Sequence, residues 1–507
     1  MRASPSLLLI TVDCFRADHA GFLGYPRATT PFLDSLAAES LVFSNAIVAG
    51  APTYFSFPAL MGSRYPLSLG RDVVGLGPDE PTIASALSES GYATGAFLAA
   101  NPYLSPRFGY DSGFSTFKDF LDARTNPLPR EPDNDQPAHL PSRWNRRLEK
   151  VSRGLGPVGT LYDELYFQYC QRLASPAAMS LDQFRRFPTA DVIVDHAQDW
   201  LKGIAGQPFF LWLHLMDPHS PYYPRQEALE LMGQGLVDAW RARYLNSYWN
   251  RGDLGASRLQ RKRKDVEALY DAGIRWVDAQ AARLVETLQG LGLWQDCVMA
   301  LTADHGEEFL DHGGRYHPPS RAGEELVRVP LLLRAPGLNQ AKVAAPFSLL
   351  HLAPTLLDIL GVPIPGSFRG RSHSALLRKG ESWDGEAIVE SVGACNNPFV
   401  TENRLQARLL AVREARYKMV FDFNSAQEEL FDLEADPREL HPLPGDAEKP
   451  VRRRLLDRAR QHLTDSLRSR DAHRRLAARL RDLRLGDLDL RSSPKMEQPL
   501  RPDVRPA

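Results

Sequence analysis

Short apolar runs, separated by helix-like stretches, constrain the fold of this chain more than any other feature. The first run is SLLLITV at residues 6–12, and it is rich in branched side chains. Three further runs lie at residues 208–215 (PFFLWLHL), 298–302 (VMALT) and 329–333 (VPLLL). Strands without polar positions are typical of a parallel sheet covered on both faces. Helical patterns lie between them, for example at Thr30–Ser40, which begins with a cap residue and a proline, and at Val266–Leu288. The alternation predicts an α/β fold with a large, mostly parallel sheet sandwiched by helices.

The character of the sequence changes near residue 381, which predicts a second, smaller unit. Alternating segments such as AIVES, LLAVRE and YKMVFDF indicate a C-terminal antiparallel sheet. With 507 residues, 43% of them hydrophobic, the chain is long enough for a large domain and a smaller one. We therefore expect three parts: a catalytic α/β domain over 1–380, a small β subdomain over 381–445, and a basic helical tail over 446–507 with a disordered end. A stretch rich in Pro, Asn, Asp and Arg predicts a surface excursion at about 123–190.

The tail places leucines at helical spacing among many arginines between Val451 and Arg484. A basic amphipathic helix of this kind either binds a membrane or a partner, or docks on its own protein with one solvated face, and we favour docking. The formal net charge of −1 gives no reason to expect a nucleic-acid partner. The sequence does not indicate an oligomeric state.

Cysteine usage and the N-terminus bear on the compartment. The four cysteines are far apart and form no C-x-x-C pair: Cys14, Cys170, Cys297 and Cys395. This pattern suggests neither a disulfide framework nor a thiolate zinc site, so a reducing compartment is expected. The first apolar run is too short for a secretory signal, and no run approaches the length of a membrane span. A cytoplasmic protein is therefore predicted.

Carboxylate and imidazole side chains follow two of the apolar runs. Asp13 directly follows the first run, at the end of a strand where open α/β sheets bind ligands. The segment TADHGEEFLDHGGRYH follows another run and holds four candidates: Asp304, His305, His312 and His317. Adjacent Asp and His supply a hard oxygen and an imidazole to a divalent cation, whereas the later histidines can donate to an anionic substrate. The two clusters together predict a metal-dependent site.

Other polar residues near these clusters are expected to have structural roles. His214 stands alone on an apolar strand, which predicts a satisfied core histidine. Glu307 and Glu308 are expected to open a helix after Gly306, because acidic side chains are favourable at a helix N-terminus. Cys14 is interpreted as a small buried thiol rather than as a metal ligand.

With both clusters in view, the sequence resembles the sulfatase family of the alkaline phosphatase superfamily. The family's opening metal-binding segment is similar to ITVDCFRADHAGFLGYPRATTPFLDSLAAESLVFSNA, and its second metal-binding segment resembles LTADHGEEFLDHG. Further family segments are matched in the expected order by LHLMDPHSPYYP, VRVPLLLRAPG, LAPTLLDILGVP, RYKMVFDF and ELFDLEADP. The resemblance implies a large α/β domain with a smaller sheet domain. It also implies that a divalent cation, held by Asp13, Asp304 and His305, assists cleavage of an anionic ester.

The nucleophile loop departs from the family pattern. In the family, a Cys or Ser converted to formylglycine stands thirteen residues before the proline of a terminal Arg-Tyr-Pro. The corresponding stretch here is APTYFSFPALMGSRYP, and counting back from Pro66 reaches Thr53. A cation that lowers the hydroxyl pKa would let Thr53 attack and would also be bound by it. Ser56 is a second candidate, although in this register it matches the motif's serine. Phe55 and Phe57 replace the family's proline and arginine.

The substitution bears on the substrate. A formylglycine hydrate releases sulfate by collapsing to an aldehyde, and a threonine ester has no such route. Superfamily relatives with an unmodified threonine act on phosphodiesters, phosphonates or phosphoglycerol groups, so the resemblance implies a phosphodiester or phosphonate of a small molecule, glycan or lipid. Two alternatives remain open. One is a true sulfuric ester hydrolase whose nucleophile is elsewhere, and the other is a degenerate member that only binds an anion.

The resemblance also suggests the metal and the substrate contacts. Cys14 follows Asp13 where the family often has a second aspartate, and His305 stands where calcium-binding sulfatases frequently have asparagine. Fewer carboxylates and an added imidazole favour Mn²⁺ or Zn²⁺ over Mg²⁺ or Ca²⁺. The remaining candidates stabilise the anion, protonate the leaving oxygen or contact the substrate: His219, His312, His317 and Asn101.

Overall fold

The computed structural model describes residues 4–121, 164–165, 167–168 and 181–466, apart from residues 71, 72, 78, 205, 233–237, 394 and 424. Most of the predicted excursion at 123–190 lies outside the described residues. So do Cys170 and the tail beyond residue 466.

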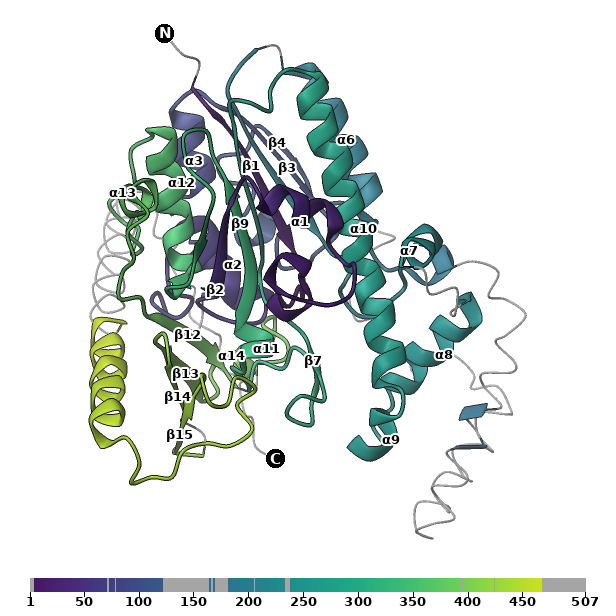
Figure 1. Cartoon of the computed structure of the whole chain (residues 1–507), viewed down its shortest axis with the longest axis vertical. Coiled ribbons are helices and arrows are strands. Elements are labelled where there is room, and N and C mark those ends of the chain that lie inside the picture. Colours follow the sequence, from purple (N-terminus) through teal and green to yellow (C-terminus); the bar gives the residue numbers. More distant parts are fainter. Residues whose placement is uncertain are drawn as a thin grey trace, which may run out of the picture.

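A large sheet runs through the centre of the molecule (Figure 1). Its main path has the strand order β10-β2-β9-β6-β1-β5-β3-β4, and β11 also pairs with β2. The strands are β1 (Ser6–Val12), β2 (Leu41–Ile47), β3 (Ala93–Leu98), β4 (Thr116–Lys118), β5 (Phe209–Leu215), β6 (Cys297–Ala303), β9 (Arg328–Arg334), β10 (Ala341–Val343) and β11 (Phe347–Ser348). All four apolar runs identified in the sequence are strands of this sheet, namely β1, β5, β6 and β9. The predicted fold class is therefore confirmed.

The central strand β1 is parallel to both of its neighbours, β5 and β6, and β3 is parallel to β5. Within the described part of this sheet, only β9 pairs antiparallel, with β2 on one side and β6 on the other. Parallel strands bring their carboxyl ends to one edge of the sheet. The residues that follow β1, β3, β5 and β6 are therefore gathered at that edge.

Two groups of helices cover the sheet (Figure 1). One group contains α1 (Pro31–Ala37), α6 (Ala190–Gly203) and α10 (Arg263–Gly290), and the other contains α2 (Thr53–Gly62), α3 (Ile83–Glu89), α12 (Leu352–Leu360) and α13 (Ser374–Lys379). The shorter helices are α7 (Gln226–Leu231), α8 (Ala239–Trp249), α9 (Ala256–Gln260), α11 (Glu324–Val327) and α14 (Thr401–Arg404). Among the described residues, no helix has both the length and the apolar character needed to span a bilayer.

The helix predicted at Thr30–Ser40 is present as α1, but Thr30 does not cap it. The carboxylate of Asp278 on α10 instead accepts from the backbone N–H groups of Phe32 and Leu33, at 3.1 and 2.9 Å. The hydrogen-bond acceptor at the N-terminus of α1 thus comes from a distant helix, whereas the sequence suggested that the neighbouring Thr30 would supply it.

A four-stranded antiparallel sheet forms the C-terminal unit, beside the large sheet in Figure 1. Its strands are β12 (Ala387–Val392), β13 (Arg408–Arg413), β14 (Tyr417–Asp422) and β15 (Gln427–Asp432). A helix over 449–466 packs on this sheet through Val451, Leu455 and Ala459, which are buried in one apolar cluster with Ile388 and Leu410. The described part of the tail is therefore docked, as predicted. The boundaries at 380 and 445 stay predictions.

Candidate active site

Two buried carboxylates meet at the carboxyl edge of the large sheet. Asp13 follows β1 and Asp304 follows β6, and the last residues of these strands, Val12 and Ala303, are paired in register. The pairing of the strands therefore brings the two side chains together, and neither is exposed to solvent. Two carboxylates held this way can supply hard oxygen ligands to a cation.

His305 lies between these carboxylates and Thr53. Its Nε2 atom is 3.6 Å from Oδ1 of Asp13 and 3.5 Å from Oδ2 of Asp304. Its Nδ1 atom is 2.8 Å from the carbonyl oxygen of Gly306 and must donate there, because that oxygen only accepts. With the tautomer assigned from this contact, Nε2 of the neutral ring carries a lone pair. A lone pair that faces two carboxylates is an arrangement that suits a divalent cation.

The surrounding protein balances the negative charge of the Asp13 and Asp304 carboxylates only in part. Burial and the adjacent Asp13 carboxylate raise the pKa of Asp304. Burial also opposes ionisation of Asp13, but the imidazoles of His219 and His214 help to hold the pKa of Asp13 well below its usual range. Oδ2 of Asp304 makes no hydrogen bond within the described chain, and no described Lys or Arg pairs with either carboxylate. A buried acceptor without a donor is unfavourable, so these residues fit a bound cation.

The structure also brings His214 into this cluster, although the sequence predicted only a core role. Its Nε2 atom is 3.3 Å from Oδ2 of Asp13, and its Nδ1 atom is 3.0 Å from the Thr11 hydroxyl. That hydroxyl can donate to the carbonyl oxygen of Leu213 or to Nδ1, so the contact is compatible with both tautomers of His214. With the proton on Nε2, His214 donates to Asp13; with the proton on Nδ1, the lone pair of Nε2 is available to a cation. Ligand atoms of Asp13, His214 and Asp304 all lie within 4.8 Å of one another.

Thr53 is the first residue of α2 and faces His305. Its Oγ1 atom is 3.2 Å from Nε2 of His305. The N-terminus of a helix favours negative charge, so α2 can stabilise an alkoxide or a transferred anion at this point. Ser56 lies deeper in α2, and its buried hydroxyl makes no hydrogen bond to a described residue.

The aromatic residue in the arginine position of the family motif is part of the core. The ring of Phe57 lies 5.2 Å from that of His214 and 5.6 Å from that of Trp212, between centroids. It is fully buried and brings no charge to the site. Recognition of an anion must therefore come from other groups.

Glu307 does not open a helix, so that expectation was wrong. The chain after Gly306 forms a short hairpin of β7 (Glu308–Phe309) and β8 (Arg315–Tyr316). The hairpin returns His317 to Glu307, whose buried carboxylate accepts from Nδ1 at 2.7 Å and from the Tyr222 hydroxyl. With Nδ1 fixed as a donor, Nε2 of His317 is free to exchange a proton with a substrate.

Two neighbours orient Asp13. The amide of Asn101 donates to Oδ2 at 3.0 Å, and the Cys14 thiol donates to Oδ1 at 3.0 Å. Burial and the carboxylate of Glu307 raise the pKa of Cys14 well above its usual range, which keeps the sulfur protonated. Asn101 and Cys14 thus hold the carboxylate in place.

A cavity of about 500 Å³ lies beside the cluster, and its wall includes Thr53 and Asn101, which contact His305 and Asp13. Four sequence-predicted residues line it: Thr53, Asn101, His219 and His317. Its other walls are mostly aromatic or apolar, with Tyr54, Tyr103, Met216, Tyr316 and Pro319, and they also include Arg315 and Asn396. The cavity can therefore receive an ester whose anionic end meets the histidines and whose organic part contacts these walls.

The structure does not bring His312 to this site. His312 lies in the turn of the β7–β8 hairpin, and its Nε2 atom is 3.3 Å from Oε2 of Glu325. It lines a different cavity, next to the C-terminal sheet. The expectation that His312 contacts the substrate was therefore wrong. Sequence proximity misled here, because the hairpin directs His312 and His317 to different places.

The contact between Glu307 and His317 predicts that Glu307 positions the imidazole of His317. We expect Glu307→Gln to lower kcat by about 10- to 100-fold, because glutamine does not select the Nδ1–H form of His317. The effect should be measured with a substrate that has a basic leaving group. The double variant with His317→Ala should be no slower than His317→Ala alone, whereas additive losses would show that Glu307 acts by another route.

The buried carboxylates and imidazoles, with a hydroxyl at a helix N-terminus and a cavity beside them, define a metal-dependent hydrolase of the α/β class. The chain belongs to the sulfatase family, since the family model named Sulfatase matches residues 5–362. A second model, for the C-terminal region of N-sulphoglucosamine sulphohydrolase, matches residues 321–465. The protein is accordingly an ester hydrolase acting on anionic esters.

Curated relatives cover most of the chain. Arylsulfatase K of Bos taurus is 24% identical over 484 residues, which are 86% of this chain and 78% of the relative. The multifunctional alkaline phosphatase superfamily protein PehA of Trinickia caryophylli is 25% identical over 491 residues, 87% of this chain and 91% of the relative.

Solved structures share the fold. One is a complex with its substrate D-glucosamine-2-N,6-O-disulfate. It has a TM-score of 0.67 at 16% identity, and the match covers 91% of this chain and 98% of that structure's chain. The phosphonate monoester hydrolase of Agrobacterium radiobacter has a TM-score of 0.59 at 20% identity, and the match covers 92% of this chain and 96% of the hydrolase. The relatives include proteins named for sulfur and for phosphorus substrates, so similarity alone does not assign the ester.

Proposed function

We propose that this enzyme cleaves a phosphodiester or a phosphonate, with Thr53 as the nucleophile. The observation that carries the proposal is the placement of the Thr53 hydroxyl, 3.2 Å from Nε2 of His305 and on the wall of the cavity. A hydroxyl at this point can form a phosphothreonine that water hydrolyses. It cannot release sulfate by aldehyde formation.

Asp13, Asp304 and His305 would hold the divalent cation together with Thr53, and His214 is placed to join them. When bound, the cation lowers the pKa of the hydroxyl and neutralises charge on the transferred group. Two carboxylates with one or two imidazoles favour Mn²⁺ or Zn²⁺ over Ca²⁺, which prefers a larger set of oxygen ligands.

The protein's own residues account for the bonds that form and break. Thr53 reacts as the alkoxide, after its hydroxyl proton has passed to solvent. Its oxygen attacks phosphorus, and the bond from phosphorus to the leaving oxygen breaks. Nε2 of His317 gives its proton to that oxygen, and His219, on the same cavity, stabilises the anion. Water then attacks the phosphothreonine and gives one proton to Nε2 of His317, while Thr53 leaves as the alkoxide with which the cycle began.

The walls of the cavity suggest the organic part of the substrate. Tyrosine, methionine and proline side chains outnumber the polar wall residues Arg315 and Asn396 around the histidines, and such surfaces bind aryl or other apolar groups better than a heavily hydroxylated sugar. We therefore favour a small-molecule ester with an apolar substituent. The cytoplasmic location stays a prediction, as does the absence of membrane contact by the tail.

A substrate panel tests the proposal. Aryl phosphate, phosphodiester, phosphonate and sulfate esters with the same leaving group would each be assayed with Mn²⁺, Zn²⁺, Mg²⁺ and Ca²⁺. We expect the highest kcat/KM for a phosphodiester or phosphonate with Mn²⁺ or Zn²⁺. A preference for the sulfate would support a sulfuric ester hydrolase instead. Tight binding of the esters without turnover would indicate a member that only binds anions.

The proposed acid gives a further prediction. His317→Ala is expected to lower kcat by about 100-fold or more for esters with basic alkoxide leaving groups, and far less for 4-nitrophenyl esters, because an acidic phenol leaves without a proton. The measurement is a leaving-group series with wild-type and variant enzyme. Equal losses across the series would remove the acid role and leave His317 only a role in binding the anion.

A further inference from the structure

Three side chains from separate segments converge where the hairpin meets the C-terminal sheet. They are His312 in the hairpin turn, Glu325 on α11 and Glu439 after β15, and their nearest ligand atoms all lie within 4.8 Å of one another. Glu325 and Glu439 are 8% and 5% exposed, whereas His312 is partly exposed. A cavity of about 370 Å³ reaches His312 and Glu439, so an ion has a path from solvent.

Glu325 is only partly compensated within this cluster. Its Oε2 atom is 3.3 Å from Nε2 of His312, whereas its buried Oε1 atom makes no hydrogen bond to a described residue. A Cβ atom on Gly323 would lie 2.4 Å from both carboxylate oxygens, so the glycine makes room for this carboxylate. Of the described Lys and Arg side chains, none forms an ion pair with Glu325.

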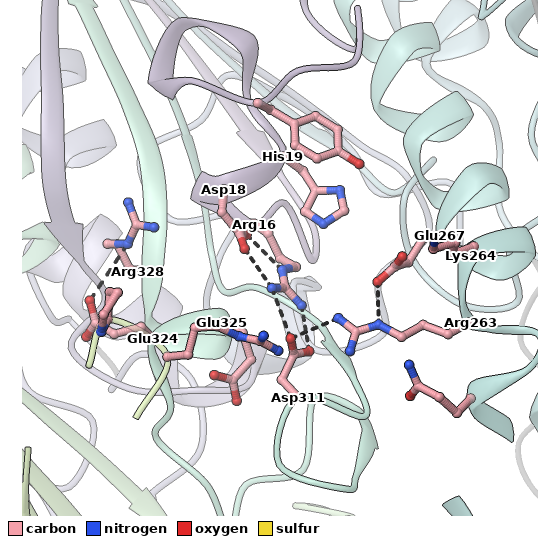
Figure 2. Close-up of a pocket in the computed structure, with 14 residues that line it drawn as sticks. Arg16, Asp18, His19, Arg263, Lys264, Glu267, Asp311, Glu324, Glu325 and Arg328 are labelled. Carbon is pink, nitrogen blue, oxygen red and sulfur yellow. Dashed lines mark hydrogen bonds and ion pairs between the residues drawn. The ribbon is translucent and has the colours of Figure 1, made fainter. Parts of the chain in front are cut away.

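The nearby cations leave Glu325 unpaired. Lys418 is shared between Glu439, a member of the cluster, at 2.8 Å and Glu324 at 3.2 Å, whereas Arg321 binds Glu308 at 3.0 Å. Figure 2 shows a polar pocket that Glu324 and Glu325 of α11 also line. Three of its arginines are paired with other carboxylates, because the ion pairs join Arg16 to Asp18 and Asp311, Arg263 to Asp311 and Glu267, and Arg328 to Glu324.

We propose that His312, Glu325 and Glu439 form a second divalent-cation site, separate from the catalytic cluster. One imidazole and two carboxylates are a donor set for a borderline cation, and we commit to Zn²⁺. The ion gives the unpartnered Oε1 atom of Glu325 a positive partner, and it is bound by Nε2 of His312 in place of the contact between His312 and Glu325. It also joins the β7–β8 hairpin to the C-terminal sheet. His317 directly follows that hairpin and lines the catalytic cavity, so a cation at this site would hold the wall of the cavity that contains His317 in position. This inference does not rest on the choice of substrate.

The test is a count of bound Zn²⁺ in the full-length protein. Protein stripped with a chelator, reloaded with Zn²⁺ and freed of excess should hold about two ions per chain, one of them at the catalytic cluster. Glu325→Gln and His312→Ala should each hold about one ion fewer, and Zn²⁺ should raise the Tm of these variants less than that of the wild type. Asp304→Ala should retain the second ion, and Asp304→Ala with Glu325→Gln should retain none.

The matched control is Glu429→Gln, which removes the same charge from an exposed residue on the wall of the same cavity. It should bind as much Zn²⁺ as the wild type. Glu325→Gln keeps the shape of the side chain, so its metal-free Tm should stay near that of the metal-free wild type and report that it folds. Equal Zn²⁺ content in wild type, Glu325→Gln and His312→Ala would overturn the site. So would an Asp304→Ala protein that holds no ion, since His312 and Glu325 would then form only an ion pair.

Discussion

Asp304→Ala is expected to remove the catalytic cation and to lower turnover by about 1000-fold or more, because a bound cation supplies several kcal/mol of transition-state stabilisation. Asp13 alone offers too few ligands, so the site needs the ends of both β1 and β6. Elemental analysis after Zn²⁺ or Mn²⁺ loading should show about one ion per chain fewer than the wild type.

Stability separates this loss from unfolding. Without metal, Asp304→Ala should be at least as stable as the wild type, because it removes a buried carboxylate that lies against Asp13 and has an unpaired oxygen. Added metal should raise the Tm of the wild type more than that of the variant. Asp199→Ala on the exposed face of α6 is the control and should behave as the wild type. A full complement of cation in Asp304→Ala would rule this assignment out.

The sequence was sufficient to predict the pair of aspartates because each directly follows a continuous apolar run. Strands of that kind pack in a parallel sheet, and their carboxyl ends share an edge, so Asp13 and Asp304 could be brought together without knowledge of the strand order. The register of β1 and β6 confirms that reasoning. The same reasoning predicted His305 at this edge, because it directly follows Asp304.

His214 was undervalued because it lies within a strand rather than after it. Its contact with Asp13 depends on the pairing of β5 with β1, in which His214 is opposite Thr11. The sequence FFLWLHL by itself does not indicate which strand pairs with β5. The polar partners of a buried histidine come from neighbouring strands, so only the order and register of the sheet reveal them.

Glu307 and His312 were misjudged for a different reason. Two glutamates after a glycine favour a helix start by local propensity, but the chain forms a hairpin whose turn contains Gly313, with φ of 82°. The turn is held by Glu308, which accepts from the backbone N–H groups of His312 and Gly314. A hairpin separates neighbours in sequence, and so His317 reaches Glu307 while His312 reaches Glu325.

Thr53→Ala is expected to reduce turnover by at least about 1000-fold, because it removes the atom that attacks phosphorus. Ser56→Ala is the matched control, since it deletes a hydroxyl from the same helix, three residues further on. The Ser56 hydroxyl makes no hydrogen bond to a described residue, so its loss should leave most activity in place. Both variants would be assayed on the best phosphorus ester of the panel, with Tm and metal content recorded alongside.

The chemical identity of the intermediate makes this the sharpest test of the proposed function. Mass spectrometry of acid-quenched wild-type enzyme should find a phosphoryl group on the peptide that contains Thr53, and no formylglycine on any peptide. The group should be absent from Thr53→Ala and present in Ser56→Ala. Phosphodiesters or phosphonates should also turn over much faster than matching sulfates, because a sulfated threonine has no aldehyde route for release. Normal turnover by Thr53→Ala, or a wild-type preference for aryl sulfate, would place the nucleophile elsewhere in the cluster.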